Sequence, residues 1–371
     1  MTLNDKAHDD WRDETQLRLR QSKLFTTIRD KCSSTDEPSG AQVMALLDDV
    51  AYYAVQRTKL VLRHMREFTL HDSDHLFRVL NLMERLIPST SLAQLSVAEL
   101  LLLILSAFLH DIGMSPAESE VEAWIKACDT ADARVDETDD LFVQFAKARP
   151  DRLEEIARLF ACGRQSEARL IQDYLVAEYI RLTHGERCRN TLANDWNKKI
   201  VYRDIDLTAD LASVCFSHTD NALALLDLDT SLVCGPETFA CLPFVGVILR
   251  LADLLDFDAK RTPSVLFAHL GIRHPVSLRE WQKHRQVASW LISPNTIAFT
   301  ARCEHPAIEA AIRGFCDIID KELIACNSVL QHMSDTLRCP LPSHYRLSLP
   351  PQVVRDKIGP SKDVRGKTIY R

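Results

Sequence analysis

The sequence predicts a mainly α-helical protein with a small α+β attachment toward its C-terminal end. Only 10 glycines occur among 371 residues, whereas good helix formers such as Leu, Ala, Arg and Glu are abundant. Apolar residues recur at helical spacing through most of the chain. After Pro263 the pattern changes, and two short runs that flank Ser293-Pro294-Asn295 predict a β-hairpin.

Helices are expected in succession along the first 260 residues. A charged helix at 7–33 should end at the turn-forming stretch 33–40, which contains Pro and Gly. Asp72 is placed to cap a later helix at its N-terminus, and Pro88 lies just beyond that helix. The helices predicted after the first are 41–66, 73–86, 95–109, 151–161, 165–188, 206–218 and 243–256.

The remaining segments differ in character. Residues 114–150 are polar and acidic, which predicts an insertion or lid with short helices, although such a charge run is usually a solvated surface. Strands at 286–292 and 296–302 should precede a helix at 306–333, and the segment from Pro340 is only weakly periodic. The expected units are an N-terminal helical extension (1–40), a helical domain (41–262), an α+β subdomain (263–335) and a C-terminal tail (336–371).

Composition narrows the class of protein. The net charge of −7 argues against a broad nucleic-acid-binding surface, though not against a local basic pocket. Eleven cysteines are scattered without a CxxC motif, which is typical of reduced, buried residues in a cytoplasmic protein. The polar stretch 1–20 does not resemble a signal peptide. The longest apolar run, Leu100 to Leu109, is too short to span a bilayer. We therefore expect a cytoplasmic protein without a membrane segment.

The most informative stretch is Phe108-Leu109-His110-Asp111-Ile112-Gly113. An apolar helix leads directly into a histidine and an aspartate, and neither side chain is easily buried unless it is paired or bound to a cation. Neighbouring helical residues point about 100° apart, so His110 can bind one metal while Asp111 lies between two. The alternative is an ordinary helix end, with His110 as a C-terminal cation and Asp111 solvated.

Other polar residues in apolar helices favour the metal site. His75, His184 and His218 lie within or at the ends of such helices, although any one of them could be a hydrogen-bonded core histidine. Asp253 lies in a leucine-rich helix, where an unpaired carboxylate costs several kcal/mol. Imidazole and carboxylate ligands suit Fe, Mn, Zn, Ni or Co rather than Ca. Six ligands exceed the needs of one tetrahedral zinc, so one or two divalent ions are expected.

In these motifs the sequence resembles the HD-domain metal-dependent phosphohydrolase superfamily. The order of His75 in Asp-His-Leu-Phe-Arg-Val, then His110-Asp111, then Asp253 in Leu-Arg-Leu-Ala-Asp-Leu-Leu-Asp is similar to its H…HD…D signature. His184 and His218 occur where binuclear members have two additional histidines. The Arg-x-x-His-x-x-Arg stretch and the hairpin followed by a helix look most like the HD-CE branch, over roughly residues 40–335.

The resemblance implies an HD-domain helical bundle, and it implies a role for each of the residues named above. One metal would be held by His75, His110, Asp111 and Asp253, and the second by Asp111, His184 and His218, with Asp111 as the bridging catalytic residue. Arginine and lysine bind phosphate, and the candidates near these motifs are Arg181, Arg187, Lys260 and Arg261. The alternative for these cations is a surface salt bridge with an acid such as Asp204, Asp206 or Glu186.

The function that the resemblance implies is hydrolysis of a phosphoester or phosphoanhydride in a nucleotide or nucleotide-derived signal by a metal-activated hydroxide. The HD-CE branch is associated with prokaryotic conflict systems, so an HSP90-like ATPase or another defence-system component is the expected partner. An alternative is a non-catalytic HD sensor that binds metal or nucleotide and regulates such a partner. A third possibility, a nuclease, is disfavoured by the acidic net charge and the lack of a basic stripe with interleaved aromatic residues.

Overall fold

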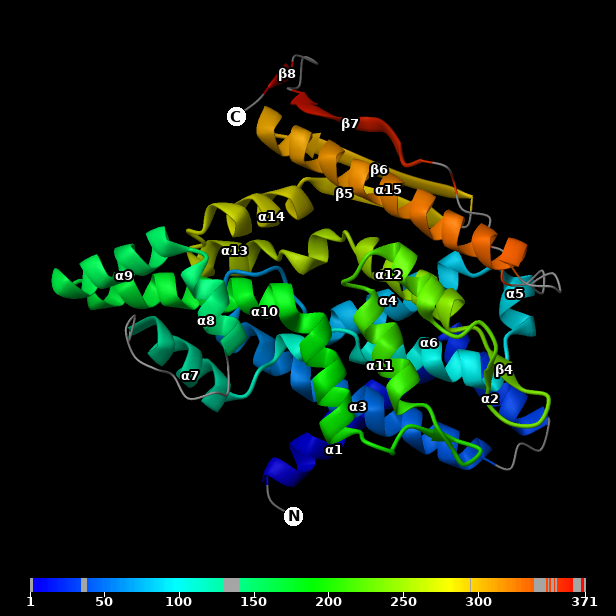
Figure 1. The fold of residues 1–371 in the computed structure, drawn as a ribbon. Helices are drawn as coiled ribbons and strands as arrows, with labels where there is room; N and C mark the ends of the chain where they lie inside the picture. The colour runs from blue at the N-terminus through cyan, green and yellow to red at the C-terminus, as the bar shows by residue number, and fades with distance from the viewer. Residues whose placement is uncertain are drawn as a thin grey trace.

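The computed structural model describes residues 3–34, 39–129, 140–293, 295–336 and 352–362, together with positions 345, 347, 350, 368 and 369. Helices account for 69% of the structure, and the sheets are small (Figure 1). The predicted fold class, mainly α with a small β-containing attachment, is therefore confirmed.

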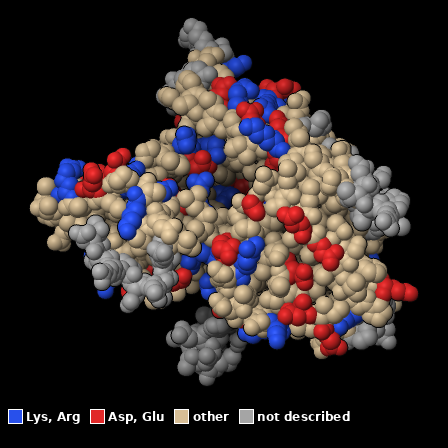
Figure 2. Space-filling model, viewed as in Figure 1, with Lys and Arg blue, Asp and Glu red and all other residues tan. Residues whose placement is uncertain are grey.

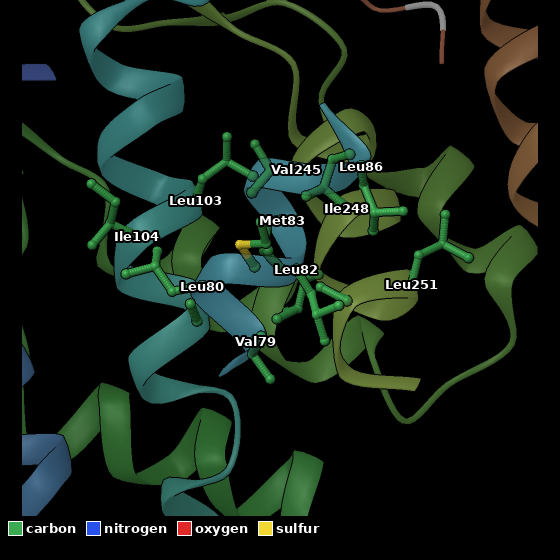
Figure 3. Close-up of a cluster of buried hydrophobic side chains, with 14 of the residues drawn as sticks. Val79, Leu80, Leu82, Met83, Leu86, Leu103, Ile104, Val245, Ile248 and Leu251 are labelled. Atoms are coloured by element: carbon green, nitrogen blue, oxygen red, sulfur yellow. The ribbon is translucent and has the colours of Figure 1, made fainter. Parts of the chain in front are cut away.

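Four helices form the centre of the core: α3 (Gly40–His64), α4 (Ser73–Leu86), α6 (Val97–Leu109) and α12 (Leu242–Leu254). Every residue of α6 is buried, and its N-terminus is closed by a capping box between Ser96 and Glu99. Figure 3 shows how Leu and Val side chains of α4 meet those of α6 and α12. Burial of this apolar surface, at roughly 25 cal/mol per Å², fixes the helix ends that carry the polar site described below.

A membrane criterion based on length and composition selects one helical stretch among the described residues, Val97–Cys128. This differs from the expectation based on the run Leu100–Leu109 alone. The apolar part of the stretch is entirely buried inside the protein, and it includes the core helix α6.

Further helices enclose this centre. The predicted helix at 7–33 is two helices, α1 (Leu3–Arg20) and α2 (Lys23–Ser34), separated by a turn in which Ser22 binds Glu84 of α4. On another side lie the long α10 (Gln165–Asp195) and the shorter α11 (Thr208–Ser217), which pack against each other.

The predicted insertion carries two of the described helices. α7 (Glu118–Asp129) and α8 (Asp140–Lys147) pack with α9 (Pro150–Ala161) and α10 around a second hydrophobic cluster. Trp124, Phe142 and Tyr179 form its aromatic centre. The acidic positions Asp132, Asp136, Glu137 and Asp139 fall outside the described residues.

Short elements connect the helices. They are α5 (Ser89–Gln94), the 3-10 helices η1 (Ile112–Met114), η2 (Ala222–Asp227) and η3 (Ala259–Arg261), and the two-residue strand pairs β1 (Val201–Tyr202) with β2 (Ile205–Asp206) and β3 (Leu232–Val233) with β4 (Phe239–Ala240).

The C-terminal part contains the predicted hairpin and long helix. After α13 (Ser264–Leu270) and α14 (Pro275–Arg285), β5 (Val287–Ser293) pairs antiparallel with β6 (Thr296–Cys303), and α15 (Pro306–Thr336) covers the sheet. Pro294 of the predicted turn is not among the described residues.

The segment predicted as a C-terminal tail contributes a strand. β7 (Val354–Lys362) lies parallel to β6, and β8 (Thr368–Ile369) pairs with β7. Apart from Ile358, the β7 side chains are exposed or half-buried, so the strand lacks the apolar alternation by which strands are recognised. Backbone pairing with β6 holds it in place. The predicted unit boundaries remain predictions.

Candidate metal centre

Four ligand positions come from the core helices. His75 lies in the first turn of α4, where the Asp72 side chain accepts a hydrogen bond from its backbone N–H at 3.0 Å, as the predicted cap requires. His110 and Asp111 follow the last residue of α6 and precede η1. Asp253 lies in the last turn of α12. Since α4, α6 and α12 pack against one another, these ends meet at one point.

Two more histidines come from the opposite wall. His184 projects from the middle of α10, and His218 caps the C-terminus of α11. Glycines make the close approach possible. A Cβ on Gly113 would lie 2.0 Å from the carbonyl oxygen of His184, and one on Gly185 would lie 2.1 Å from Oγ1 of Thr219, beside His218. Gly246 of α12 also lies close to a neighbour, because a Cβ there would meet the Leu225 side chain at 2.3 Å.

Asp111 stands between two pairs of histidines. Its Oδ2 atom lies 3.3 Å from Nε2 of His75 and 3.4 Å from Nε2 of His110. Its Oδ1 atom lies 3.6 Å from Nε2 of His184 and 3.7 Å from Nε2 of His218. The two oxygens of one carboxylate therefore face different imidazole pairs.

Asp253 completes the first of these groups. Its Oδ1 atom lies 3.5 Å from Nε2 of His75 and 3.7 Å from Nε2 of His110. Two potential metal-holding groups result, His75-His110-Asp111 and Asp111-His184-His218, with Asp253 beside the first. The structure thus brings together all six residues that the sequence singled out as ligands.

Each imidazole is oriented by a hydrogen bond at its other ring nitrogen. Nδ1 of His110 faces the carbonyl of Ala107 at 3.1 Å, and Nδ1 of His184 faces that of Arg181 at 2.6 Å. The corresponding acceptor for His218 is the carbonyl of Cys215. Because the acceptor fixes a proton on Nδ1, the lone pair of Nε2 points into the centre, as in histidines that bind metals.

His75 has a charged acceptor instead. Its Nδ1 lies 2.6 Å from Oδ2 of Asp256, a fully buried carboxylate three residues after Asp253. Arg78 donates to the other Asp256 oxygen at 2.8 Å, and Arg261 donates to the Asp256 carbonyl at 3.2 Å. Burial opposes ionisation of Asp256, but His75 and the two arginines outweigh it and lower the pKa of this carboxyl.

The chemistry of the donors fits divalent cations. Two Nε2 lone pairs face each other at 3.3 Å between His75 and His110, and at 3.0 Å between His184 and His218. Such an arrangement is unfavourable without a positive charge between the nitrogens. Ligand nitrogens at about 2.0–2.1 Å from one metal are about 2.9–3.4 Å apart, which matches both pairs.

The ionisation of the carboxylates agrees with this interpretation. Burial by itself would raise the pKa of Asp111, but His110, His218 and His75 outweigh it and hold the pKa well below its usual range. Burial also opposes ionisation of Asp253, but the neighbouring His110 and His75 outweigh it and lower the pKa of this carboxyl. Both groups are therefore anionic at neutral pH. Burial lowers the pKa of His184, which keeps that imidazole neutral.

The centre opens into a large cavity. Asp111, His184 and Asp253 line one end of a space of about 1310 Å³, which exceeds the roughly 300–1,000 Å³ of most small-molecule pockets. α13 and α14 form its roof, and residues of α10 form the opposite wall. Figure 2 shows the hollow in the middle of this face, with Lys and Arg side chains inside it and along its upper edge.

The four cations considered for phosphate binding occupy different places. Arg181 lines the cavity one helical turn before His184, and among the described residues no carboxylate forms an ion pair with it. Arg261 also lines the cavity but is buried, with its guanidinium bound to His71 and to the carbonyls of Leu70 and Asp256.

The other two lie away from the centre. Arg187 forms two 3.0 Å hydrogen bonds with the Glu120 carboxylate and a third with the Gly113 carbonyl. Its partner is therefore Glu120 rather than the acids considered from the sequence. Lys260 is exposed and lines a separate depression formed with α13 and α14. Phosphate binding by any of the four remains a prediction.

Two residues of the site were not assigned from the sequence. Asp256 could have been found, because it lies one turn after Asp253 in the same motif. No local sequence feature assigns His71 to the site, yet its Nε2 lies 2.7 Å from the Arg261 guanidinium. Burial and the charge of Arg261 lower the pKa of His71 to about 3.

Comparison with known proteins agrees with this geometry. The family model described as HD-CE matches residues 65–325, a range that contains all six ligand positions and the roof helices α13 and α14. A comparison with curated proteins gives no match, and neither does one with solved structures.

Proposed function

Because the chain belongs to the HD-CE family, we propose that it is a metal-dependent phosphohydrolase acting on a phosphoester or phosphoanhydride of a nucleotide or nucleotide-derived signal. One observation carries the proposal: the two oxygens of Asp111 face two separate histidine pairs at 3.3–3.7 Å. This arrangement is typical of a carboxylate shared by two cations. It lies at the end of a cavity large enough for a nucleotide.

The residues have distinct roles in this proposal. Divalent ions bound there would supply a water of lowered pKa and neutralise phosphate oxygens. His75, His110 and Asp253 hold one ion position, and His184 and His218 hold the other, while Asp111 fixes the spacing between them. Asp256 keeps the His75 ring in the orientation that directs Nε2 inward.

Arg181 is the residue best placed to bind the substrate phosphate. It lies on the same helix as His184, and its guanidinium contacts the Phe68 ring at 5.7 Å while lining the cavity. A guanidinium without a carboxylate partner can offer two parallel donors to a phosphate group.

The proposal is tested by metal analysis and a substrate screen on protein purified without chelator. We expect close to two equivalents of Mn, Fe, Co, Ni or Zn, and release of phosphate or a nucleoside product from at least one nucleotide. The double variant His110→Ala/Asp111→Ala should lose both metal and turnover. Turnover that persists in this variant would refute the proposal.

A sensor function is the second candidate, and one contact favours it. Glu322 of α15 binds Arg250 of α12, which in turn binds the end of α11 beside His218. A structural change caused by metal or nucleotide binding at the centre could thereby be transmitted to the C-terminal sheet and to a bound partner. An HSP90-like ATPase or another component of a conflict system is the partner that we propose. Metal-dependent nucleotide binding without product would favour this alternative.

A further inference from the structure

The roof helix α14 separates two spaces. Ser277 and Glu280 line the cavity of the metal centre, whereas Arg279 and Arg285 line an outer depression of about 1210 Å³ on the other side of the helix. Successive helical residues are about 100° apart, which places the two sets on opposite faces of α14. Among the described residues that line the outer depression, none is one of the six metal-ligand positions. A molecule bound in it would therefore lie apart from the ions.

Three cations line the outer depression. Lys260 comes from η3, and Arg279 and Arg285 come from α14. All three are exposed, and no carboxylate among the described residues forms an ion pair with any of them. Their charges are therefore available to a ligand.

The acids of the outer depression do not neutralise these cations. Asp74 lines it too, but Arg18 of α1 already binds this carboxylate at 2.8 Å. Glu304 is the other acid in the lining, and it forms no ion pair with a described residue. The positive charges thus exceed the free negative charge, which favours an anionic ligand.

Arg285 is held in place for such a contact. Its guanidinium lies over the Phe267 ring of α13 at 4.2 Å. Stacking leaves the N–H groups in the plane of the guanidinium free, and they can donate in parallel to two phosphate oxygens. Three positive charges around one space suit a chain of linked phosphates better than a single carboxylate.

We propose that the outer depression is a second binding site, which takes a small molecule with two or more linked phosphates and does not hydrolyse it. Lys260, Arg279 and Arg285 would bind the phosphate oxygens. Lys260, which the sequence predicts as a phosphate ligand, would act here rather than at the metal centre. This site goes beyond the proposed function and does not rest on it.

The test is the binding of tripolyphosphate to the metal-free full chain, measured by calorimetry in excess chelator at low ionic strength. The wild type should bind it. Lys260→Gln, Arg279→Gln and Arg285→Gln should each weaken binding about three- to tenfold, as expected for loss of a charge-assisted hydrogen bond at an exposed position. Arg279→Lys, which keeps the charge but loses the paired donors, should have an intermediate affinity.

Hydrogen–deuterium exchange of the wild type, with and without tripolyphosphate, locates the bound molecule. Amide exchange should slow in η3 and in the C-terminal half of α14. The part of α10 around Arg181, in the cavity of the metal centre, should exchange as before.

Two variants that also remove one positive charge serve as controls. Lys23→Gln changes an exposed lysine of α2, and Arg181→Gln changes the arginine of the metal-centre cavity. Both should bind tripolyphosphate within about twofold of wild type, because neither cation lines the outer depression. The double variant His110→Ala/Asp111→Ala should also bind it as the wild type does.

Absence of binding by the wild type, or equal affinities of the wild type and the three glutamine variants of the depression, would overturn the site. Loss of binding in Arg181→Gln alone would overturn it too, because the anion would then lie in the metal-centre cavity. Failure of the proposed function is a separate result. It is measured by metal content and turnover, whereas this test is carried out without metal.

Discussion

The buried Arg250 of α12 and the half-buried Glu322 of α15 form an ion pair in which Nε and Oε1 are 2.6 Å apart. The same guanidinium donates to the carbonyls of Ser217 and Asp220, the latter at 2.7 Å. His218 lies between these two carbonyls in the chain. The long helix of the C-terminal part is therefore connected to one of the metal-ligand positions through a single arginine.

We expect Glu322→Ala to lower the affinity for the metal ion at the position formed by Asp111, His184 and His218. Without its carboxylate partner, Arg250 loses the contact that orients it toward the end of α11. Loss of such an outer contact commonly lowers metal affinity 10–100-fold, so a decrease of about tenfold is expected. A stepwise manganese titration should show one weakened and one unchanged affinity. The exposed Glu304→Gln change serves as control, and equal weakening of both affinities would contradict the coupling.

Asp256→Asn should lower the affinity for the metal ion at the position formed by His75, His110, Asp111 and Asp253. The amide cannot supply the negative charge that orients His75, and the two arginines beside it lose their counter-charge. A 10–100-fold loss of affinity for the ion near His75 is the expected result. Elemental analysis at limiting metal would detect it. Asp74→Asn, at an exposed carboxylate on the same helix as His75, should leave the metal content unchanged.

Gly113→Ala should destabilise the protein and disturb the metal centre together. The added Cβ would lie 2.0 Å from the carbonyl oxygen of His184 and 2.6 Å from the backbone nitrogen of Cys188, and neither backbone atom can move aside easily. Overpacking of this kind costs about 1–3 kcal/mol.

The matched control for this change is Gly314→Ala in α15. A Cβ there meets nothing within 4 Å, so this variant should gain about 0.5–1 kcal/mol from reduced flexibility of the unfolded chain. Urea unfolding of both variants provides the measurement. A Gly113→Ala protein as stable as wild type would show that η1 and α10 are less closely packed than described.

The stability of the metal-free protein should fall as the pH decreases below about 6.5, the ordinary pKa of histidine. Burial, together with Arg261 and Lys283, holds the pKa of His284 well below that value. In this interval the unfolded chain binds a proton that the folded chain does not, so unfolding becomes easier, by at most about 1.4 kcal/mol per pH unit for one group.

Replacement of His284 by Asn should flatten this dependence. Denaturant unfolding at pH 7.5, 6.0 and 5.0 in the presence of chelator measures the slope. The exposed His269→Asn change should leave it as in wild type. A slope that is unaltered in His284→Asn would show that other groups carry the acid sensitivity.

Helical spacing and caps sufficed to predict most of the helical fold. The cap at Asp72 and the apolar run of α6 are local features, and local features determine where such helices begin and end. The strand β7 escaped prediction because its position depends on pairing with β6 across the intervening helix, and only Ile358 in it is buried. A strand that is held by pairing with a distant segment and that buries few apolar side chains has no recognisable sequence pattern.

The same distinction applies to the site. The sequence singled out the four histidines and two aspartates that the structure brings together, because a histidine or aspartate in an apolar helix is conspicuous. The partners of the arginines and lysines could not be predicted. Arg187, for example, pairs with Glu120, which lies 67 positions away in the chain. No local sequence pattern shows where the helix that carries Glu120 packs. The roof residues Lys283 and His284 likewise acquire their environment only through the packing of α14 on Phe257 and Phe315.

One attachment of the roof to the rest of the protein is at Glu67. Glu67 accepts hydrogen bonds from the backbone of Arg273 and His274 and from the Tyr174 hydroxyl, and its own carbonyl accepts one from Trp281. None of the six ligand positions depends on these bonds. Substitutions in α13 and α14 can therefore alter which molecule fits beneath them while the ion-holding helices stay as they are. In the function that we propose, the roof could thus change the shape of the substrate space while the six residues around the ions keep their places.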